Sequence, residues 1–168
     1  HPDGADFNEH TALWDANCIF CHNTKAQPGY DFARQTFASR VEQLGIGCES
    51  CHGPGDAHAA RNANPLRRYA LYFSERPDPT IVNPERLDKV AQVQVCGHCH
   101  GQRLPNPTER IRQFMTSGDP YTPGSDLSAV TTPIWRDSHL QGIDLSLRFW
   151  RDGTPRLTAY EYQSILMT

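Results

Sequence analysis

The chain has 168 residues and a formal net charge of −3, from 16 Lys and Arg against 19 Asp and Glu. This length suits a single domain, and the near-balanced charge excludes the strongly basic field typical of nucleic-acid-binding proteins. No apolar run approaches the roughly 18 residues of a membrane-spanning helix. Because 13 Pro and 12 Gly accompany few large aliphatic side chains, we expect metal, disulfides or a large apolar cofactor to complete the core.

Two segments in the first 100 residues carry helix signals. Apolar residues recur at near-helical spacing through residues 31–44, and Gly45 follows as a stop. Asn83 and Pro84 have the character of an N-cap and a first helical residue. An apolar stripe then leads toward residue 96 and predicts a second helix. The stripes consist of Ala33, Phe37, Val41 and Leu44 in the first helix, and of Leu87, Val90, Ala91 and Val95 in the second.

The C-terminal third carries weaker signals. Residues 105–133 are rich in Pro and Gly and predict a loop. Residues 145–160 alternate apolar and polar side chains around an Asp-Gly pair, which predicts a small exposed β-hairpin. Thr158 and Glu161 form a capping box that starts a final helix. Since this helix has barely begun where the sequence stops, we expect that the native protein continues or that the helix docks on something outside this chain.

All six cysteines belong to three C-x-x-C-H motifs, at residues 18–22, 48–52 and 96–100. This pattern is the attachment signature of c-type haem. Two thiols three positions apart reach the two vinyl groups of one porphyrin as thioethers, and the adjacent His projects at the iron. We therefore predict three covalent haem c groups, with thioethers at Cys18, Cys21, Cys48, Cys51, Cys96 and Cys99 and proximal iron ligands at His22, His52 and His100.

Three other chemistries use C-x-x-C pairs, and each explains less of the pattern. Two pairs could form one Cys₄ zinc site, but the third pair and the His after every second Cys would have no role. Disulfides between cysteines three apart would constrain little of a chain this long. A thioredoxin-like site needs one motif rather than three.

Three irons with two axial ligands each require three distal ligands. The best candidates are His10, His58 and His139, and His1, His98, Met115 and Met167 are weaker ones. His58 lies beyond a Gly-Pro-Gly turn after His52, so it points away from the haem of its own motif and reaches a neighbour's. His10 precedes the first motif by one short segment, and His139 would give the haem-free third of the chain a reason to be ordered. Bis-His ligation is typical of low-potential electron transfer.

The six propionates of three haems need partners as well. Guanidinium groups match carboxylates bidentately. The candidate partners are Arg34, Arg40, Arg67, Arg68, Arg103 and Arg112.

Residues 45–55 together with His58 resemble the G-x-G-C-E-x-C-H-G-P-G-x-x-H element of periplasmic multihaem cytochromes c. They are similar to cytochromes associated with hydroxylamine oxidation and to longer bacterial multihaem proteins. Trp14, residues 96–103 and 152–156, and the Glu-Tyr pair at 161–162 look like the second group. The resemblance implies His58 as a distal ligand and low-potential electron transfer outside the cytoplasmic membrane. It also implies further haem motifs beyond this chain, which we therefore expect to be a fragment or mature part of a longer protein.

These observations predict one trihaem domain over residues 1–168 with a mainly α fold and extensive irregular coil. Short helices wrap around closely packed haems in segments 10–30, 45–60 and 84–103, and residues 104–168 bind no haem except through His139. The predicted function is electron transfer between redox partner proteins, which include other multihaem cytochromes or copies of this chain, in the periplasm or outside the cell. A variant is a subunit of an extended haem conduit.

The alternative is an oxidoreductase with one five-coordinate haem that acts on a small nitrogen or sulfur compound. The sequence contains no acid/base pair, nucleophile or nucleotide-binding motif that would support an enzyme. It also contains more spare His residues than three irons need. Electron transfer without catalysis is therefore favoured.

Overall fold

Short helices and irregular chain make up most of the computed structural model, which describes residues 14–74, 76–139, 144–156 and 159–168. The α-helices are α2 (Ile19–His22), α3 (Glu49–His52), α4 (Asp56–Asn62), α5 (Pro65–Tyr72), α6 (Lys89–Gly97), α7 (Ile111–Ser117) and α8 (Glu161–Leu166). Single 3₁₀ turns lie at η1 (Trp14–Ala16), η2 (Pro84–Arg86), η3 (Thr108–Arg110), η4 (Leu127–Ala129) and η5 (Leu145–Arg148). The strands are β1 (Asn23–Gln27), β2 (Arg40–Leu44), β3 (Arg103–Pro105) and β4 (Thr131–Pro133). The predicted fold class, short helices in much coil, is confirmed.

The prediction of a helix over residues 31–44 is wrong, because residues 40–44 form strand β2. This strand pairs antiparallel with β1, from Asn23 opposite Leu44 to Gln27 opposite Arg40. The aromatic residues at the tip of this hairpin pack on one another instead of forming a helix face. The Tyr30 ring centroid lies 4.8 Å from that of Phe32 and 4.6 Å from that of Phe37. Backbone pairing with β1, which lies against the first cysteine motif, therefore outweighs the helical spacing.

The helix that leads into the third motif is present but begins later than predicted. Asn83 caps only the turn η2, where its side chain accepts from the Glu85 backbone N–H at 3.2 Å. Asp88 then caps α6 by accepting from the Ala91 N–H at 2.9 Å. Two successive capping side chains thus divide one predicted helix into a 3₁₀ turn and an α-helix.

The sequence predicts a loop over residues 105–133, but this segment contains helix α7 and strand β4. Strand β4 pairs antiparallel with β3, from Arg103 opposite Pro133 to Pro105 opposite Thr131. Phe114 of α7 is buried and its ring centroid lies 6.3 Å from that of Phe20. Several prolines of this segment lie at the ends of short helices and strands and do not prevent these from forming.

The hairpin predicted over residues 145–160 consists of one turn and one bridge. Asp152 accepts hydrogen bonds from the backbone N–H and hydroxyl of Thr154, as the turn requires, and Phe149 bridges Pro155 antiparallel. Leu145, expected in a strand, begins the turn η5 instead. Its side chain is buried in a small core with Ile134, Phe149 and Tyr160, and Leu104 packs against that core.

The final helix α8 packs on α6 and the third cysteine motif. It begins at Glu161 without a side-chain cap, and Thr158 of the predicted capping box lies outside the described residues. A Cβ added at Gly97 would lie 2.4 Å from the Tyr162 ring, so this glycine lets the helix approach closely. Gln163 is fully buried and donates to the carbonyls of Gln102 at 2.7 Å and Ile134 at 3.3 Å. The helix therefore docks on α6 and the third motif of this chain, so no outside partner is needed to hold it.

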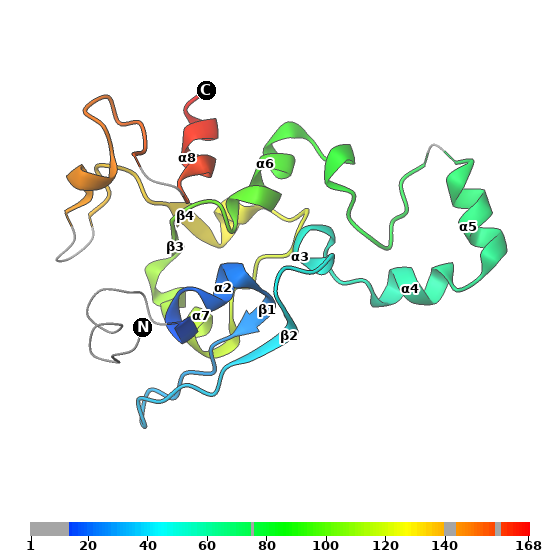
Figure 1. Cartoon of the computed structure of the whole chain (residues 1–168), viewed down its shortest axis with the longest axis horizontal. Coiled ribbons are helices and arrows are strands. Elements are labelled where there is room, and N and C mark those ends of the chain that lie inside the picture. The colour runs from blue at the N-terminus through cyan, green and yellow to red at the C-terminus, as the bar shows by residue number, and fades with distance from the viewer. Residues whose placement is uncertain (1–13, 75, 140–143, 157–158) are drawn as a thin grey trace.

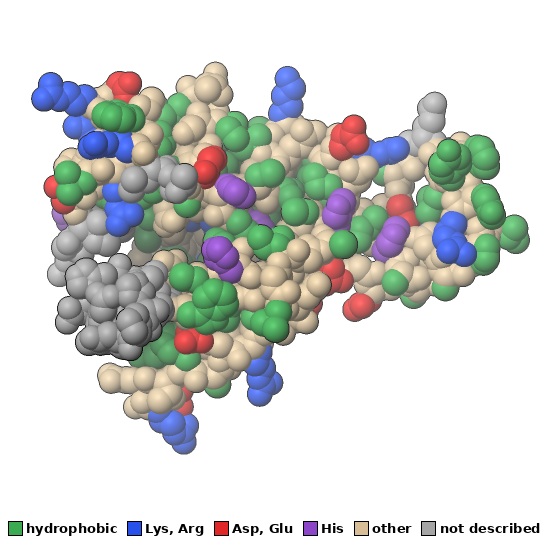
Figure 2. Space-filling view, viewed as in Figure 1, with side chains coloured by type: hydrophobic (Ala, Val, Ile, Leu, Met, Phe, Trp, Pro, Cys, Tyr) green, Lys and Arg blue, Asp and Glu red, His purple; other side chains and the backbone are tan. Residues whose placement is uncertain are grey.

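An arm, residues 56–83, leaves the body of the molecule beyond α3 (Figure 1). It consists of α4, α5 and the return segment to η2. Hydrophobic side chains cover its far end (Figure 2), where Leu66, Tyr72 and Phe73 are largely exposed. Among the described residues, none of the helices has the length and apolar character needed to cross a membrane.

The Gln163→Ala substitution tests the anchoring of the C-terminal segment. We expect a loss of about 2 kcal/mol in the free energy of unfolding, because the Ile134 carbonyl would lose this buried donor and the Gln102 carbonyl would keep only the Ile134 N–H. Urea denaturation of the haem-loaded protein measures this loss. Gln113→Ala, on the exposed face of α7, is the matched control and should change stability little. Equal losses in the two variants would contradict the anchoring role.

Candidate functional site

The three cysteine motifs adopt the same single helical turn. The backbone N–H of His22, His52 and His100 donates to the carbonyl of the first Cys of its motif at 3.0, 3.0 and 2.8 Å. In each motif the N–H of the second Cys contacts the same carbonyl at 3.2 Å. Residues three and four apart in a helical turn share one face. Each turn therefore presents two thiols and an imidazole together, as one porphyrin requires.

Two of the three alternative chemistries, disulfides and a zinc site, can be compared with the arrangement of the described residues. None of the six cysteines forms a disulfide. Within the described ranges, no group of three or more Cys, His, Asp or Glu side chains is arranged to hold a metal ion, as a zinc site would require.

The three motifs lie close together around the third. The Cys21 thiol donates to the Cys99 carbonyl at 3.6 Å. The interaction with Cys99 lowers the pKa of Cys21 to about 7, and the pKa of Cys99 is raised in return. Burial, together with the thiols of Cys96 and Cys48, raises the pKa of Cys51. The first and second motifs thus both adjoin the third, and α2, α3 and α6 gather in the body of the molecule (Figure 1).

The imidazoles that follow the cysteines are exposed, and each has a different neighbour. His52 Nδ1 lies 2.7 Å from the Val82 carbonyl oxygen, and the Val82 N–H donates to the His52 carbonyl at 3.0 Å. His100 Nδ1 lies 3.8 Å from a Glu161 carboxylate oxygen. The His22 ring centroid lies 6.3 Å from that of Trp14. A partner on Nδ1 fixes the ring and leaves Nε2 for iron.

The surface around the motifs fits a large apolar cofactor. Leu44 and Ile46, just before the second motif, are 82% and 66% exposed, and Val90 on α6 is 64% exposed. Trp14, beside His22, is 44% exposed. Side chains of this kind normally lie inside a protein. A porphyrin tethered at each motif would cover such apolar surface and supply the core that the composition lacks.

His58, predicted as a distal ligand, lies on α4 with its Nδ1 already engaged. Nδ1 is 3.2 Å from Asp78 Oδ2, and the His58 side chain is 41% exposed. Hydrogen bonds from the Thr80 hydroxyl and the Asn62 amide hold the pKa of Asp78 well below its usual range, so this partner is a carboxylate. His58 thus presents Nε2 as its remaining nitrogen. The preceding turn is held by Glu49, which accepts from the Gly55 N–H at 2.7 Å.

The structure gives less support to the other predicted distal ligands. His139 lies exposed on the loop after β4, and no hydrogen-bond partner for it is seen in the described ranges. His10 lies outside the described residues. His98, a weaker candidate, has both nitrogens engaged, with Nδ1 3.1 Å from the Val95 carbonyl and Nε2 3.2 Å from the Cys99 sulfur. Burial lowers the pKa of His98, whose ring packs on that of Tyr121.

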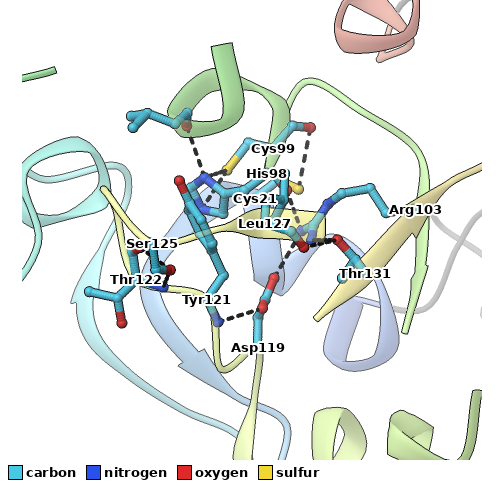
Figure 3. Close-up of polar contacts among 11 residues, drawn as sticks. Cys21, His98, Cys99, Arg103, Asp119, Tyr121, Thr122, Ser125, Leu127 and Thr131 are labelled. Carbon is cyan, nitrogen blue, oxygen red and sulfur yellow. Dashed lines mark hydrogen bonds and ion pairs between the residues drawn. The ribbon is translucent and has the colours of Figure 1, made fainter. Parts of the chain in front are cut away.

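A largely buried ion pair supports the third motif (Figure 3). Arg103 donates to Asp119 Oδ2 at 2.9 Å, to the His98 carbonyl and to the Thr131 hydroxyl. The two charged side chains are 9% and 14% exposed. Arg103 was predicted to pair with a haem propionate, but its guanidinium is engaged by Asp119. Arg34 and Arg67 are likewise paired, with Asp31 and Asp78.

Sequence reasoning missed several supporting residues. Val82 acts through its backbone, and Asp78 and Asp119 lie 20 and 16 positions from the side chains they contact. No motif or spacing in the sequence marks them, because the contacts depend on how the arm and the β3–β4 sheet fold back.

Part of the chain matches the model of a known protein family. Residues 4–53 match the model of the family cytochrome c554 and c-prime, which comprises multihaem c-type cytochromes. This segment contains the first two motifs, and the match implies covalent haem c and haem-mediated electron transfer. The third motif lies beyond the matched residues. No curated protein and no solved structure matches the chain.

The Asp119→Ala substitution tests the support of the third motif. We expect about 3 kcal/mol of destabilisation, because Arg103 would keep a buried charge without its partner. Thermal unfolding of the haem-loaded protein measures the effect. Glu42→Ala breaks the exposed pair with Lys25 and should leave the unfolding midpoint nearly unchanged. A midpoint for Asp119→Ala within error of that control would show that the pair gives no support.

Proposed function

We propose that this chain is a trihaem c-type electron-transfer protein. Three thioether pairs would hold the haems, at Cys18 and Cys21, Cys48 and Cys51, and Cys96 and Cys99, with His22, His52 and His100 as proximal ligands. The observation that carries this proposal is the identical helical turn of the three motifs. The family match over residues 4–53 supports the cofactor for the first two.

A bound haem supplies a one-electron Fe(III)/Fe(II) couple at each motif. The residues of the chain hold and orient these groups, and the contact between the first and third motifs brings their attachment points together. The second motif also adjoins the third. The proposed route for electrons therefore runs through the third motif, with the first and second motifs as entry and exit.

The distal ligands proposed are His58, His10 and His139, which would give three low-potential, bis-His haems. Support is strongest for His58, since Asp78 engages its Nδ1 and leaves Nε2 available. His10 and His139 are proposed from their positions in the sequence alone.

A second candidate function is an oxidoreductase with one five-coordinate haem acting on a small nitrogen or sulfur compound. The exposed position of His139, on a loop with no partner seen in the described ranges, favours it. If His139 does not reach an iron, one axial position stays open for a substrate.

The proposed partners are redox proteins, including other multihaem cytochromes or further copies of this chain in an extended conduit. Nucleic acid is not a proposed partner, because the net charge is −3. The proposed location is the periplasm or the cell exterior, where haem c is attached.

Haem content and spin state test the proposal together. We expect the denatured protein to retain three covalent haems by mass and the oxidised protein to give only low-spin ferric signals in electron paramagnetic resonance. The Cys48→Ala/Cys51→Ala double variant should retain two haems. Fewer than three haems in the unmodified protein would refute the trihaem proposal, and a high-spin signal equal to one haem would favour the enzyme instead.

A further inference from the structure

A largely buried carboxylate ties the three segments of the arm together. The side chain of Asp78 is 10% exposed. Its Oδ2 atom faces α4, 3.2 Å from His58 Nδ1 and 3.0 Å from Asn62 Nδ2. Its Oδ1 atom accepts from Arg67 of α5 at 3.2 Å and from the Thr80 hydroxyl at 2.6 Å. One carboxylate thus fixes the position of His58 relative to the whole arm.

These contacts also decide which nitrogen of His58 carries a proton. A carboxylate accepts hydrogen bonds, so the neutral ring places its N–H at Nδ1, facing Asp78. The Asn62 amide, 3.1 Å from the same nitrogen, has its own acceptors in Asp78 and in the His58 carbonyl at 2.9 Å. Nε2 therefore keeps its lone pair, as a metal ligand requires.

His58 lines a pocket of about 390 Å³ inside the arm. Leu71, Tyr72 and Ile81 contribute apolar walls to this pocket. Arginine side chains contribute positive charge, namely Arg68 of α5, Arg76 of the return segment and Arg86 of η2, which follows the arm. Asp78 also lines the pocket, with its carboxylate already engaged by Arg67 and Thr80. Apolar walls, further cations and an imidazole suit a flat apolar molecule that carries a metal and anionic groups.

The haem of the second motif is not the one that His58 would ligate. His52 Nδ1 faces the carbonyl of Val82, whose neighbours Ile81 and Asn83 line the pocket. The two nitrogens of an imidazole point in nearly opposite directions, so the Nε2 of His52 faces away from this segment. The inference therefore assigns His52 and His58 to different irons.

We infer that the arm pocket binds the propionate-bearing edge of the haem that His58 ligates, with Arg68 and Arg76 at the propionates and Asp78 as the positioning residue of His58. This inference rests on the proposed function and names a ligand site within it. The haem comes either from another motif of this chain or from a second molecule.

The redox potential of each haem separates the role of Asp78 from that of Arg68 and Arg76, because the two variants should shift the potential in opposite directions. Asp78→Asn removes negative charge from His58, weakens electron donation to iron and should raise the potential of one haem. Arg68→Ala/Arg76→Ala leaves the propionates uncompensated and should lower the potential of the same haem. Asp56→Asn and Arg61→Ala, exposed residues of α4, are the matched controls. Unchanged potentials in both test variants would overturn the inference.

A spectroscopic test covers the case in which Asp78→Asn fails to fold. His58→Gly retains the Asp78 contacts with Arg67 and Thr80, and it should convert one low-spin haem to high spin. Added imidazole should restore the low-spin signal. If the low-spin signal of the unmodified protein is lost on dilution, the haem that His58 ligates belongs to a second molecule. If the low-spin signal stays constant, that haem belongs to this chain.

The outcomes distinguish this inference from the proposed function. Fewer than three haems in the unmodified protein would overturn both. Three haems whose spectra are the same in His58→Gly and in the unmodified protein would overturn the inference and the proposed ligand role of His58. The trihaem electron-transfer function would stand, because electron transfer does not depend on which residue is the distal ligand.

Discussion

The fold depends on one local constraint, the helical turn that places two thiols and an imidazole on one face. This turn is closed within five residues by hydrogen bonds to the carbonyl of the first cysteine. A chain with so few buried apolar side chains cannot form a large core of its own. Under the proposed function, the three turns would fix where the cofactors complete the structure, and the other elements act as supports around them.

The third motif receives the most support, and it comes from the segment that contains no cysteine. Arg103 and Asp119 hold the turn from beneath, and α8 covers it through Tyr162 and Gln163. The motif that adjoins both others is thus the most firmly held. Such rigidity suits a central site, because the spacing between redox groups has to stay constant during electron transfer.

Polar contacts, and not apolar packing, hold the arm together. It has no buried apolar side chain of its own among the described residues. Its segments are joined by a polar cluster around Asp78, and hydrogen bonds between Val82 and His52 attach it to the second motif. Polar clusters define geometry more sharply than a small apolar contact, since each hydrogen bond has a preferred direction. This explains how a thin projection can present His58 in a fixed orientation.

The cysteine motifs, the histidines that follow them and the general fold class can be read from the sequence alone. These follow from local chemistry, because spacings of three and four residues place groups on one helical face. The sequence did not determine that residues 40–44 form a strand or that residues 111–117 form a helix, since β1 and Phe20 lie elsewhere in the chain. Only the tertiary structure decided the partners of His52, His58 and Arg103. Those contacts join residues 16 to 30 positions apart, and no local pattern records such distances.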